Sequence, residues 1–292
     1  MKLLRWLQNQ IGNAQLLRWL DKKMCVFDCR SIPDPIFIVG SPRVGSTVFF
    51  QSVIAKYQMA YLSNLHSLFF SQPCLADILV RAIKFCGFSH RHTMKSDFGY
   101  TAGVLGPSEA GATFRYWFGD ADFSLNDHIT NCQQVISAVA TLSKSAAGPL
   151  ISKNLFNSMR LKEILKCFPN AFLVWVQRDH SSTAQSILKM RRSINGTDKK
   201  WTSVSIPNQQ EVLKYLPEEQ VLQQILAIET YIKQYFEQHR EGRTFMVSYD
   251  SFRLEPEKII DRFIKKYSEI SGYEVSIRDG FCSSVFDQVN HS

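Results

Sequence analysis

The sequence predicts an α/β fold: a single domain with a parallel β-sheet flanked by helices, of the P-loop nucleotide-binding type. Short apolar strands alternate with helical segments along most of the chain, which is typical of a parallel sheet covered on both faces. A glycine-rich turn follows the first strand, where such folds bind phosphate. Without an internal repeat or linker, the simplest division is an N-terminal amphipathic helical segment (1–30) and one domain (31–292).

Four short, mostly apolar runs predict the strands. Each is bounded by proline, glycine or polar residues, and each has the length of a strand rather than a buried helix. They lie at 36–39 (IFIV), 149–152, 171–176 (AFLVWV) and 244–248 (TFMVS).

Longer segments between these runs predict helices or mixed helical regions. They lie at 46–57, 62–88, 126–145, 158–166, 182–190, 217–238 and 255–268. Stretches rich in Gly, Ser, Thr or other polar residues predict loops at 91–112 and 191–209.

The first helical segment, residues 2–23, is amphipathic and cationic. Leucine and isoleucine recur at helical spacing, and lysine and arginine lie around them. Two interpretations stay open: an interfacial anchor that makes peripheral contact with a membrane, or a first helix that packs on the body of the protein.

The bulk composition is that of a folded, basic protein. The chain has 292 residues, of which 45% are hydrophobic and 21% charged, with a formal net charge of +8. This composition argues against disorder, and the charge suits an anionic small molecule, an acidic membrane or a nucleic acid. Because no helix-turn-helix, zinc-finger or RNA-recognition signature is present, we expect no nucleic-acid partner.

The seven cysteines are scattered, without a C-x-x-C pair or a histidine at metal-ligand spacing. We therefore expect reduced thiols, no metal and a cytoplasmic location. No apolar run reaches the ~18 residues of a membrane span, and no secretory signal is recognisable.

The glycine-rich turn carries the first candidate site. Gly40 and Gly45 are spaced as in G-x-x-x-x-G-K-[ST], but Ser46 replaces the lysine and Arg43 supplies a cation earlier in the loop. Backbone N–H groups, with the hydroxyls of Ser46 and Thr47, can bind an anion at the start of the following helix. A donor with one phosphate and one further anionic group needs neither the lysine nor Mg²⁺.

A second candidate site follows the strand at 171–176. Arg178 ends that strand and Ser186 lies eight residues later, so an arginine fork and a hydroxyl could hold one phosphate. Taken alone, this pattern also fits a helix-capping Asp179 beside a surface arginine.

Taken together, the two motifs resemble those of the sulfotransferases that use 3′-phosphoadenosine 5′-phosphosulfate (PAPS), in particular the bacterial carbohydrate-type enzymes. PRVGST (42–47) is similar to the family's P-[RK]-[ST]-G-[ST]-[ST] loop, with Val44 in place of a hydroxyl residue, and RDHSSTAQS (178–186) has the spacing of its 3′-phosphate pair. Segments 151–179 and 247–267 also resemble the family. The resemblance implies PAPS as co-substrate, no metal, and these donor-binding residues: Arg43, Val44, Gly45, Ser46, Thr47, Arg178, Ser186 and Tyr249.

The same resemblance implies the catalytic residues. Arg43 and Lys153 would neutralise the departing phosphate, although Lys153 could also be an ordinary exposed lysine. Two candidates for the general base stay open: Glu109, in a loop (96–111) similar to that of saccharide-type relatives, and His66, which could also be a core histidine. Asp97 is a third, less favoured choice.

The sequence thus predicts transfer of the PAPS sulfuryl group to a hydroxyl acceptor, a saccharide or glycoconjugate before other small molecules. A P-loop nucleotide kinase is the alternative enzyme, disfavoured by Ser46 at the lysine position. A catalytically silent nucleotide-binding module is the alternative from another class.

Overall fold

A sheet of four parallel strands, in the order β2–β1–β3–β4, forms the centre of the molecule in the computed structural model. The structure describes residues 2–25, 32–88, 90, 101–120, 131–239 and 242–291. The strands are β1 (Ile36–Val39), β2 (Ile151–Lys153), β3 (Phe172–Gln177) and β4 (Thr244–Ser248), close to their predicted ranges. The predicted single α/β domain with a parallel sheet is confirmed.

Side chains of the strands alternate between two separate cores. In β1, Phe37 and Val39 join one core, Ile36 and Ile38 join the other, and none is more than 1% exposed. The residues of β3 alternate in the same way. Because both faces of β1 and β3 are buried, these two central strands are almost continuous apolar runs, which made them recognisable in the sequence.

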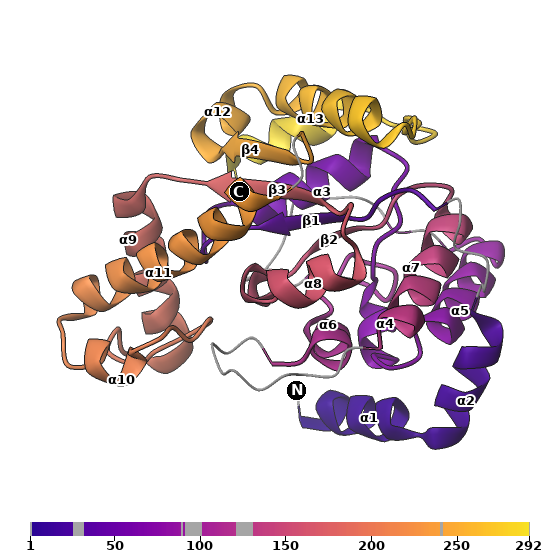
Figure 1. The fold of residues 1–292 in the computed structure, drawn as a ribbon, viewed down its shortest axis with the longest axis horizontal. Coiled ribbons are helices and arrows are strands. Elements are labelled where there is room, and N and C mark those ends of the chain that lie inside the picture. The colour runs from indigo at the N-terminus through magenta and orange to yellow at the C-terminus, as the bar shows by residue number, and fades with distance from the viewer. Residues whose placement is uncertain are drawn as a thin grey trace.

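Helices cover both faces of the sheet (Figure 1). One face packs against α3 (Ser46–Lys56), α12 (Tyr249–Leu254), α13 (Pro256–Ser271) and η2 (Ser283–His291). The other packs against α6 (Gly111–Phe118), α7 (Cys132–Ala146), η1 (Leu155–Met159), α8 (Leu161–Cys167) and α11 (Pro217–Gln238). Farther from the sheet lie α1 (Lys2–Asn13), α2 (Gln15–Met24), α4 (Asn64–Leu68), α5 (Pro73–Phe85), α9 (His180–Asn195) and α10 (Gln209–Val212).

Helix α9 continues to Asn195 through residues that were predicted to begin a polar loop. Arg191 is the reason: it is fully buried, donates hydrogen bonds to Gln220 and Gln224 of α11, and lies 5.1 Å from the ring centroid of Trp201. A buried arginine looks like a surface residue in the sequence, because only its tertiary partners reveal its burial.

The prediction of reduced cysteines is wrong for four of them. Disulfides join Cys25 at the end of α2 to Cys74 in α5, and Cys132 in α7 to Cys167 in α8. Cys86 and Cys282 are free and exposed. The bonded pairs are 49 and 35 residues apart, so they have no local signature and come together only through helix packing.

The N-terminal segment is two helices rather than one. It breaks at Ala14, and α1 then packs against α4 while α2 packs against α5. At the corner, a side chain on Gly12 would overlap the ring of Phe70, so only glycine allows this close approach. Within the described part of the chain, no helix combines the length and the apolar character that a bilayer crossing requires.

Candidate functional site

The topology brings the two predicted anion-binding motifs together. From β1 the chain moves outward to β2 on one side, whereas β3 leads to β4 on the other. Neighbouring β1 and β3 therefore form a topological switch point, where parallel sheets bind ligands at the carboxyl ends of their strands. The glycine loop follows β1 and Arg178 follows β3, so both lie at this point.

Gly45 and Arg43 give the loop its shape. Gly45 has φ +85°, and a Cβ there would lie 2.1 Å from the ring of Tyr249. Arg43 has φ +66°, an uncommon backbone conformation for a residue with a side chain. Val44 is fully buried in the core shared with α3, so its side chain packs where the family motif has a hydroxyl residue.

Ser158, which the sequence analysis did not select, anchors the entrance of the loop. Its hydroxyl accepts from the N–H of Gly40 and donates to the Gly40 carbonyl, both at 3.1 Å. Ser158 lies in η1, directly after β2, and is fully buried. Nothing local in the sequence distinguishes it from other serines.

The first turn of α3 is available to an anion. Its N-cap is Gly45, and within the described residues no side chain caps this end of the helix. The N–H groups of Ser46 and Thr47 are among the first N–H groups of the helix, which have no intrahelical acceptor. Together with the helix dipole, they are suited to bind a phosphate or sulfate group.

Four predicted donor-binding residues from different segments meet beside the loop. The Nε of Arg43 donates to the Ser186 hydroxyl at 3.1 Å, and the Arg178 guanidinium donates to the Arg43 carbonyl at 3.4 Å. The Arg178 guanidinium also lies 5.0 Å from the ring centroid of Tyr249. This group of residues, Arg43, Arg178, Ser186 and Tyr249, is called the arginine cluster below.

The electrostatics of the arginine cluster favour a bound anion. Burial and the neighbouring charge of Arg178 lower the pKa of Arg43. The Nε of Arg178 is buried and has no hydrogen-bond partner among the described residues, and the same holds for the Ser41 hydroxyl in the loop. A phosphate oxygen would satisfy such donors and offset the repulsion between the two guanidinium groups. The residues therefore fit the donor that the sequence motifs imply.

Asp179 has the capping role that was considered for it. Its carboxylate accepts from the N–H of Ser182 at 2.8 Å and caps α9. This cap does not compete with the phosphate-binding interpretation, because it fixes the start of the helix that carries Ser186.

Lys153 and Glu109 form a second polar pair. Lys153 ends β2 and makes an ion pair with the Glu109 carboxylate, and it is largely buried, unlike an ordinary surface lysine. Asn154 donates to the Glu109 carbonyl at 2.7 Å, and Ala110 follows with φ +45°. The position of Glu109 is thus held from both its side chain and its backbone, and Asn154 is a contributor that the sequence analysis missed.

His66 has a structural role as part of the N-terminal cap of α4. Its Nδ1 accepts from the N–H of Ser63 at 3.1 Å, which completes a capping box at the start of α4. The ring is buried, and burial together with Lys84 lowers its pKa to about 3. Among the described residues, no hydrogen bond or ion pair joins His66 to Glu109, and Asp97 lies outside those residues.

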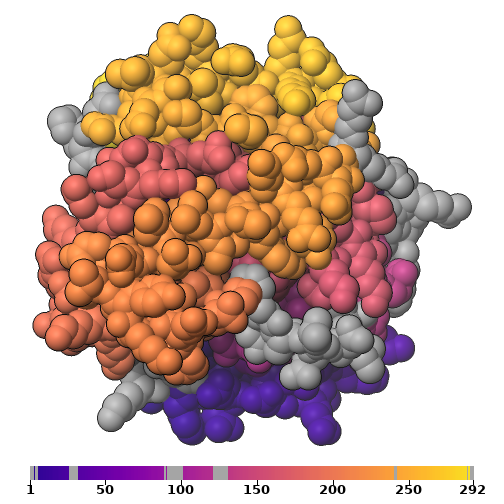
Figure 2. Space-filling view, turned by 60° about the vertical axis from the view of Figure 1, so that its left-hand side comes forward, coloured from indigo at the N-terminus to yellow at the C-terminus, as the bar shows by residue number. Residues whose placement is uncertain are grey.

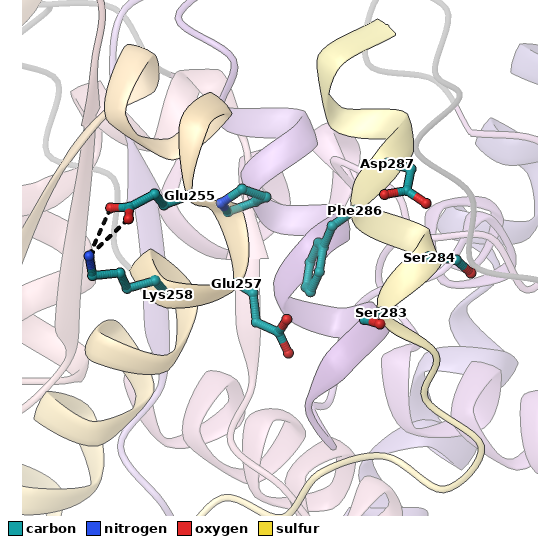
Figure 3. Close-up of a pocket in the computed structure, with 8 residues that line it drawn as sticks. Glu255, Glu257, Lys258, Ser283, Ser284, Phe286 and Asp287 are labelled. Carbon is teal, nitrogen blue, oxygen red and sulfur yellow. Dashed lines mark hydrogen bonds and ion pairs between the residues drawn. The ribbon is translucent and has the colours of Figure 1, made fainter.

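A hollow of about 490 Å³ between the start of α13 and η2 is less suited to an anionic donor (Figure 3). Three carboxylates line it, those of Glu255, Glu257 and Asp287. Lys258, the lysine that lines this hollow, donates hydrogen bonds to both carboxylate oxygens of Glu255. The arginine cluster is therefore the better candidate for the donor site.

Two solved structures of sulfotransferases resemble this chain. The sulfotransferase STF9 from Mycobacterium avium has a TM-score of 0.55 at 15% identity, over 89% of this chain and 68% of that protein. The sulfotransferase STF1 from Mycobacterium tuberculosis H37Rv has a TM-score of 0.48 at 10% identity, over 98% and 76% of the two chains. At these identities, the likeness to STF9 supports the fold alone.

The sequence comparison goes further than the fold. No curated protein matches the chain, but residues 35–267 match the model of the sulfotransferase family. The match runs from the residue before β1 into α13 and includes both the loop and the arginine cluster. This chain therefore belongs to the sulfotransferase family and is a PAPS-dependent enzyme.

Proposed function

We propose that this sulfotransferase transfers the sulfuryl group of PAPS to a hydroxyl group of a saccharide or glycoconjugate. The observation that carries the proposal is the arginine cluster, in which two guanidinium groups meet at the switch point of the sheet. PAPS carries a phosphosulfate and a phosphate on one adenosine, so its binding site needs two neighbouring groups of anion-binding residues.

In this proposal, each end of the donor has its own residues. The 5′-phosphosulfate binds to the loop at residues 43–47, and the 3′-phosphate binds to Arg178 and Ser186. Tyr249 borders the nucleotide and supports both Gly45 and Arg178, with which it is in contact. The hydrogen bond between Arg43 and Ser186 supports the idea that the two ends adjoin.

Catalysis requires a base for the acceptor and positive charge for the leaving group. The acceptor oxygen forms a bond to sulfur, the bond from sulfur to the bridging phosphate oxygen breaks, and the acceptor proton passes to the base. We assign the base to Glu109, because its carboxylate is about a third exposed and is held by Lys153, whereas the His66 ring is buried in a helix cap. Arg43 and Lys153 neutralise the departing phosphate, so the proposal includes no metal.

The acceptor and the location are proposed from the sequence. A saccharide hydroxyl is proposed because the loop at 96–111 resembles that of saccharide-type relatives, and other small-molecule acceptors belong in the same assay. The cytoplasmic location stays a prediction from the sequence. The two disulfides favour an oxidising compartment instead.

Titration calorimetry tests the donor site. 3′-Phosphoadenosine 5′-phosphate should bind with clearly higher affinity than adenosine 5′-phosphate. Arg178→Ala and Ser186→Ala should each weaken binding of the bisphosphorylated nucleotide only, and the loss for Arg178→Ala should be about tenfold or more. Arg192→Ala is the matched control, because this α9 arginine is exposed and pairs with Asp198. Equal losses for both nucleotides would contradict a 3′-phosphate site.

Two further outcomes identify the alternatives. Tight binding of Mg-ATP with no response to the bisphosphorylated adenosine would indicate a kinase. Nucleotide binding without transfer of labelled sulfate to any member of a panel of saccharides and small alcohols would indicate a silent module.

A further inference from the structure

Helices α1 and α2 contact the rest of the protein through polar groups. Gln8 donates to the Ser67 carbonyl at 2.7 Å, and Arg18 donates to the Ser71 hydroxyl at 3.1 Å. Further along α2, the buried carboxylate of Asp21 accepts from the N–H of Leu75 in α5 at 2.8 Å. The Cys25–Cys74 disulfide closes this contact. Hydrogen bonds and a disulfide thus help to hold the inward side of the two helices.

The opposite sides of the same helices are apolar and exposed. Five large side chains are between 37% and 70% exposed, and they define the N-terminal apolar face: Leu3, Trp6, Leu7, Leu16 and Trp19. An amphipathic helix on a globular protein normally turns its apolar stripe toward the core. Here Ile11, Leu17 and Leu20 are half-buried, but the five side chains of the N-terminal apolar face point outward. Packing within the described part of the chain does not account for this face.

Basic side chains lie beside the N-terminal apolar face. Lys22 and Lys23 are exposed in the last turn of α2, and the Lys23 ammonium lies 6.0 Å from the ring centroid of Trp19. Figure 1 shows both helices at the outer edge of the molecule, and Figure 2 shows this end of the chain (indigo) along one border of the surface. A flat partner could therefore reach them without meeting the sheet or its flanking helices.

We propose that the N-terminal apolar face docks on an anionic lipid bilayer. Tryptophan prefers the boundary between headgroups and acyl chains, and leucine side chains on the same helices can enter the acyl region. Lysines beside them attract anionic headgroups. A second copy of the chain fits less well, because a symmetric contact would bring like-charged lysines together. The proposal does not depend on sulfuryl transfer.

Vesicle co-sedimentation of the full chain tests the proposal. Binding should be stronger to phosphatidylcholine vesicles with about a third phosphatidylglycerol than to pure phosphatidylcholine, and should fall as salt rises. Trp6→Ser/Trp19→Ser should lower the partition coefficient at least tenfold. Lys22→Gln/Lys23→Gln should lower it about 25-fold on anionic vesicles only, at about fivefold for each lysine.

A control pair keeps the proposal falsifiable. Met246→Ser/Leu254→Ser removes two exposed apolar side chains elsewhere and should bind vesicles like the original protein. Sedimentation-velocity measurements without lipid follow self-association, and binding of the bisphosphorylated adenosine checks that each variant is folded. The proposal is overturned if the original protein ignores anionic vesicles, if the control pair loses as much binding, or if the tryptophan pair instead abolishes a dimer.

Discussion

Gly45 is the residue at which the donor loop has least freedom. Its φ is positive, and the ring of Tyr249 occupies the space that a Cβ at this position would need. The same ring lies against Arg178, so displacing it also disturbs the proposed phosphate site. The absence of a side chain at position 45 is therefore needed both for the conformation of the loop and for the proposed phosphate site.

Gly45→Ala should weaken binding of 3′-phosphoadenosine 5′-phosphate at least tenfold and lower the Tm. Gly272→Ala is the matched control, because Gly272 has φ +70° but a Cβ there would meet no other atom within 4 Å. The control should show only the backbone strain, about 1–3 kcal/mol, with unchanged nucleotide affinity. Calorimetry measures the loss of nucleotide affinity and thermal unfolding measures the loss of stability in both variants. If Gly45→Ala and Gly272→Ala bind the nucleotide equally well, the contact between Gly45 and Tyr249 has no role in donor binding.

The assignment of the general base to Glu109 rather than His66 can be tested with single substitutions. Glu109→Gln should lower kcat by about 10²- to 10⁴-fold and abolish the fall in rate at acid pH, since protonation of the base causes that fall. His66→Gln should leave the shape of the profile unchanged, because glutamine is a regular partner of serine in a capping box. A pH–rate profile of kcat/KM for the three proteins checks this. Loss of the acid limb in the His66 variant would reverse the assignment.

At the scale of elements, the contact between α2 and α5 depends on pH. Burial raises the pKa of Asp21 to about 6, against an ordinary value near 4. Between these values, the folded protein binds the proton more tightly than the unfolded chain. The stabilisation from this proton is therefore complete below about pH 4 and is lost as the pH rises through 6.

Asp21→Asn should remove this dependence. The amide keeps an oxygen that can accept from Leu75 and carries no charge, so at pH 7 the variant should be more stable than the original by on the order of 2–3 kcal/mol. Below pH 4 the two proteins should be nearly equal. Chemical unfolding at several pH values measures the difference, and a difference that does not change with pH would disprove the buried charge.

At the scale of the whole molecule, the proposed donor site joins segments that follow three strands. The loop follows β1, Arg178 and α9 follow β3, and Tyr249 follows β4. A ligand that contacts all of them stabilises the folded chain as a unit, because it binds only when the segments are assembled.

The bisphosphorylated adenosine at a hundredfold excess over its Kd should thus raise the free energy of unfolding by about 2.7 kcal/mol. The corresponding rise in Tm is roughly 5 °C for a chain of this size. EDTA should leave both this shift and turnover unchanged, since side chains supply the positive charge in the proposal. Thermal unfolding with and without the nucleotide checks this prediction, with Arg178→Ala as the negative control. A rise in Tm that requires Mg²⁺ would contradict a donor site without metal.

Much of the fold and the outline of the site were predictable from local patterns. The central strands β1 and β3 were recognisable because both of their faces are buried, so their sequences are almost entirely apolar. The loop at 40–47 and the pair Arg178 and Ser186 were recognisable because a phosphate needs fixed residue types at fixed spacing after a strand. The family match then identified the enzyme class.

Local sequence patterns were sufficient to predict the central strands, the alternation of strands and helices along the chain, and the chemistry of the donor motifs, because these depend on neighbours along the chain. Tertiary structure alone decided that Ser158 and Asn154 hold the loop and Glu109, that four cysteines pair, and that His66 caps a helix. It also decided that five large apolar side chains of the N-terminal helices face outward. These features depend on contacts between residues far apart in the chain, and no local pattern records which distant partner a side chain will meet.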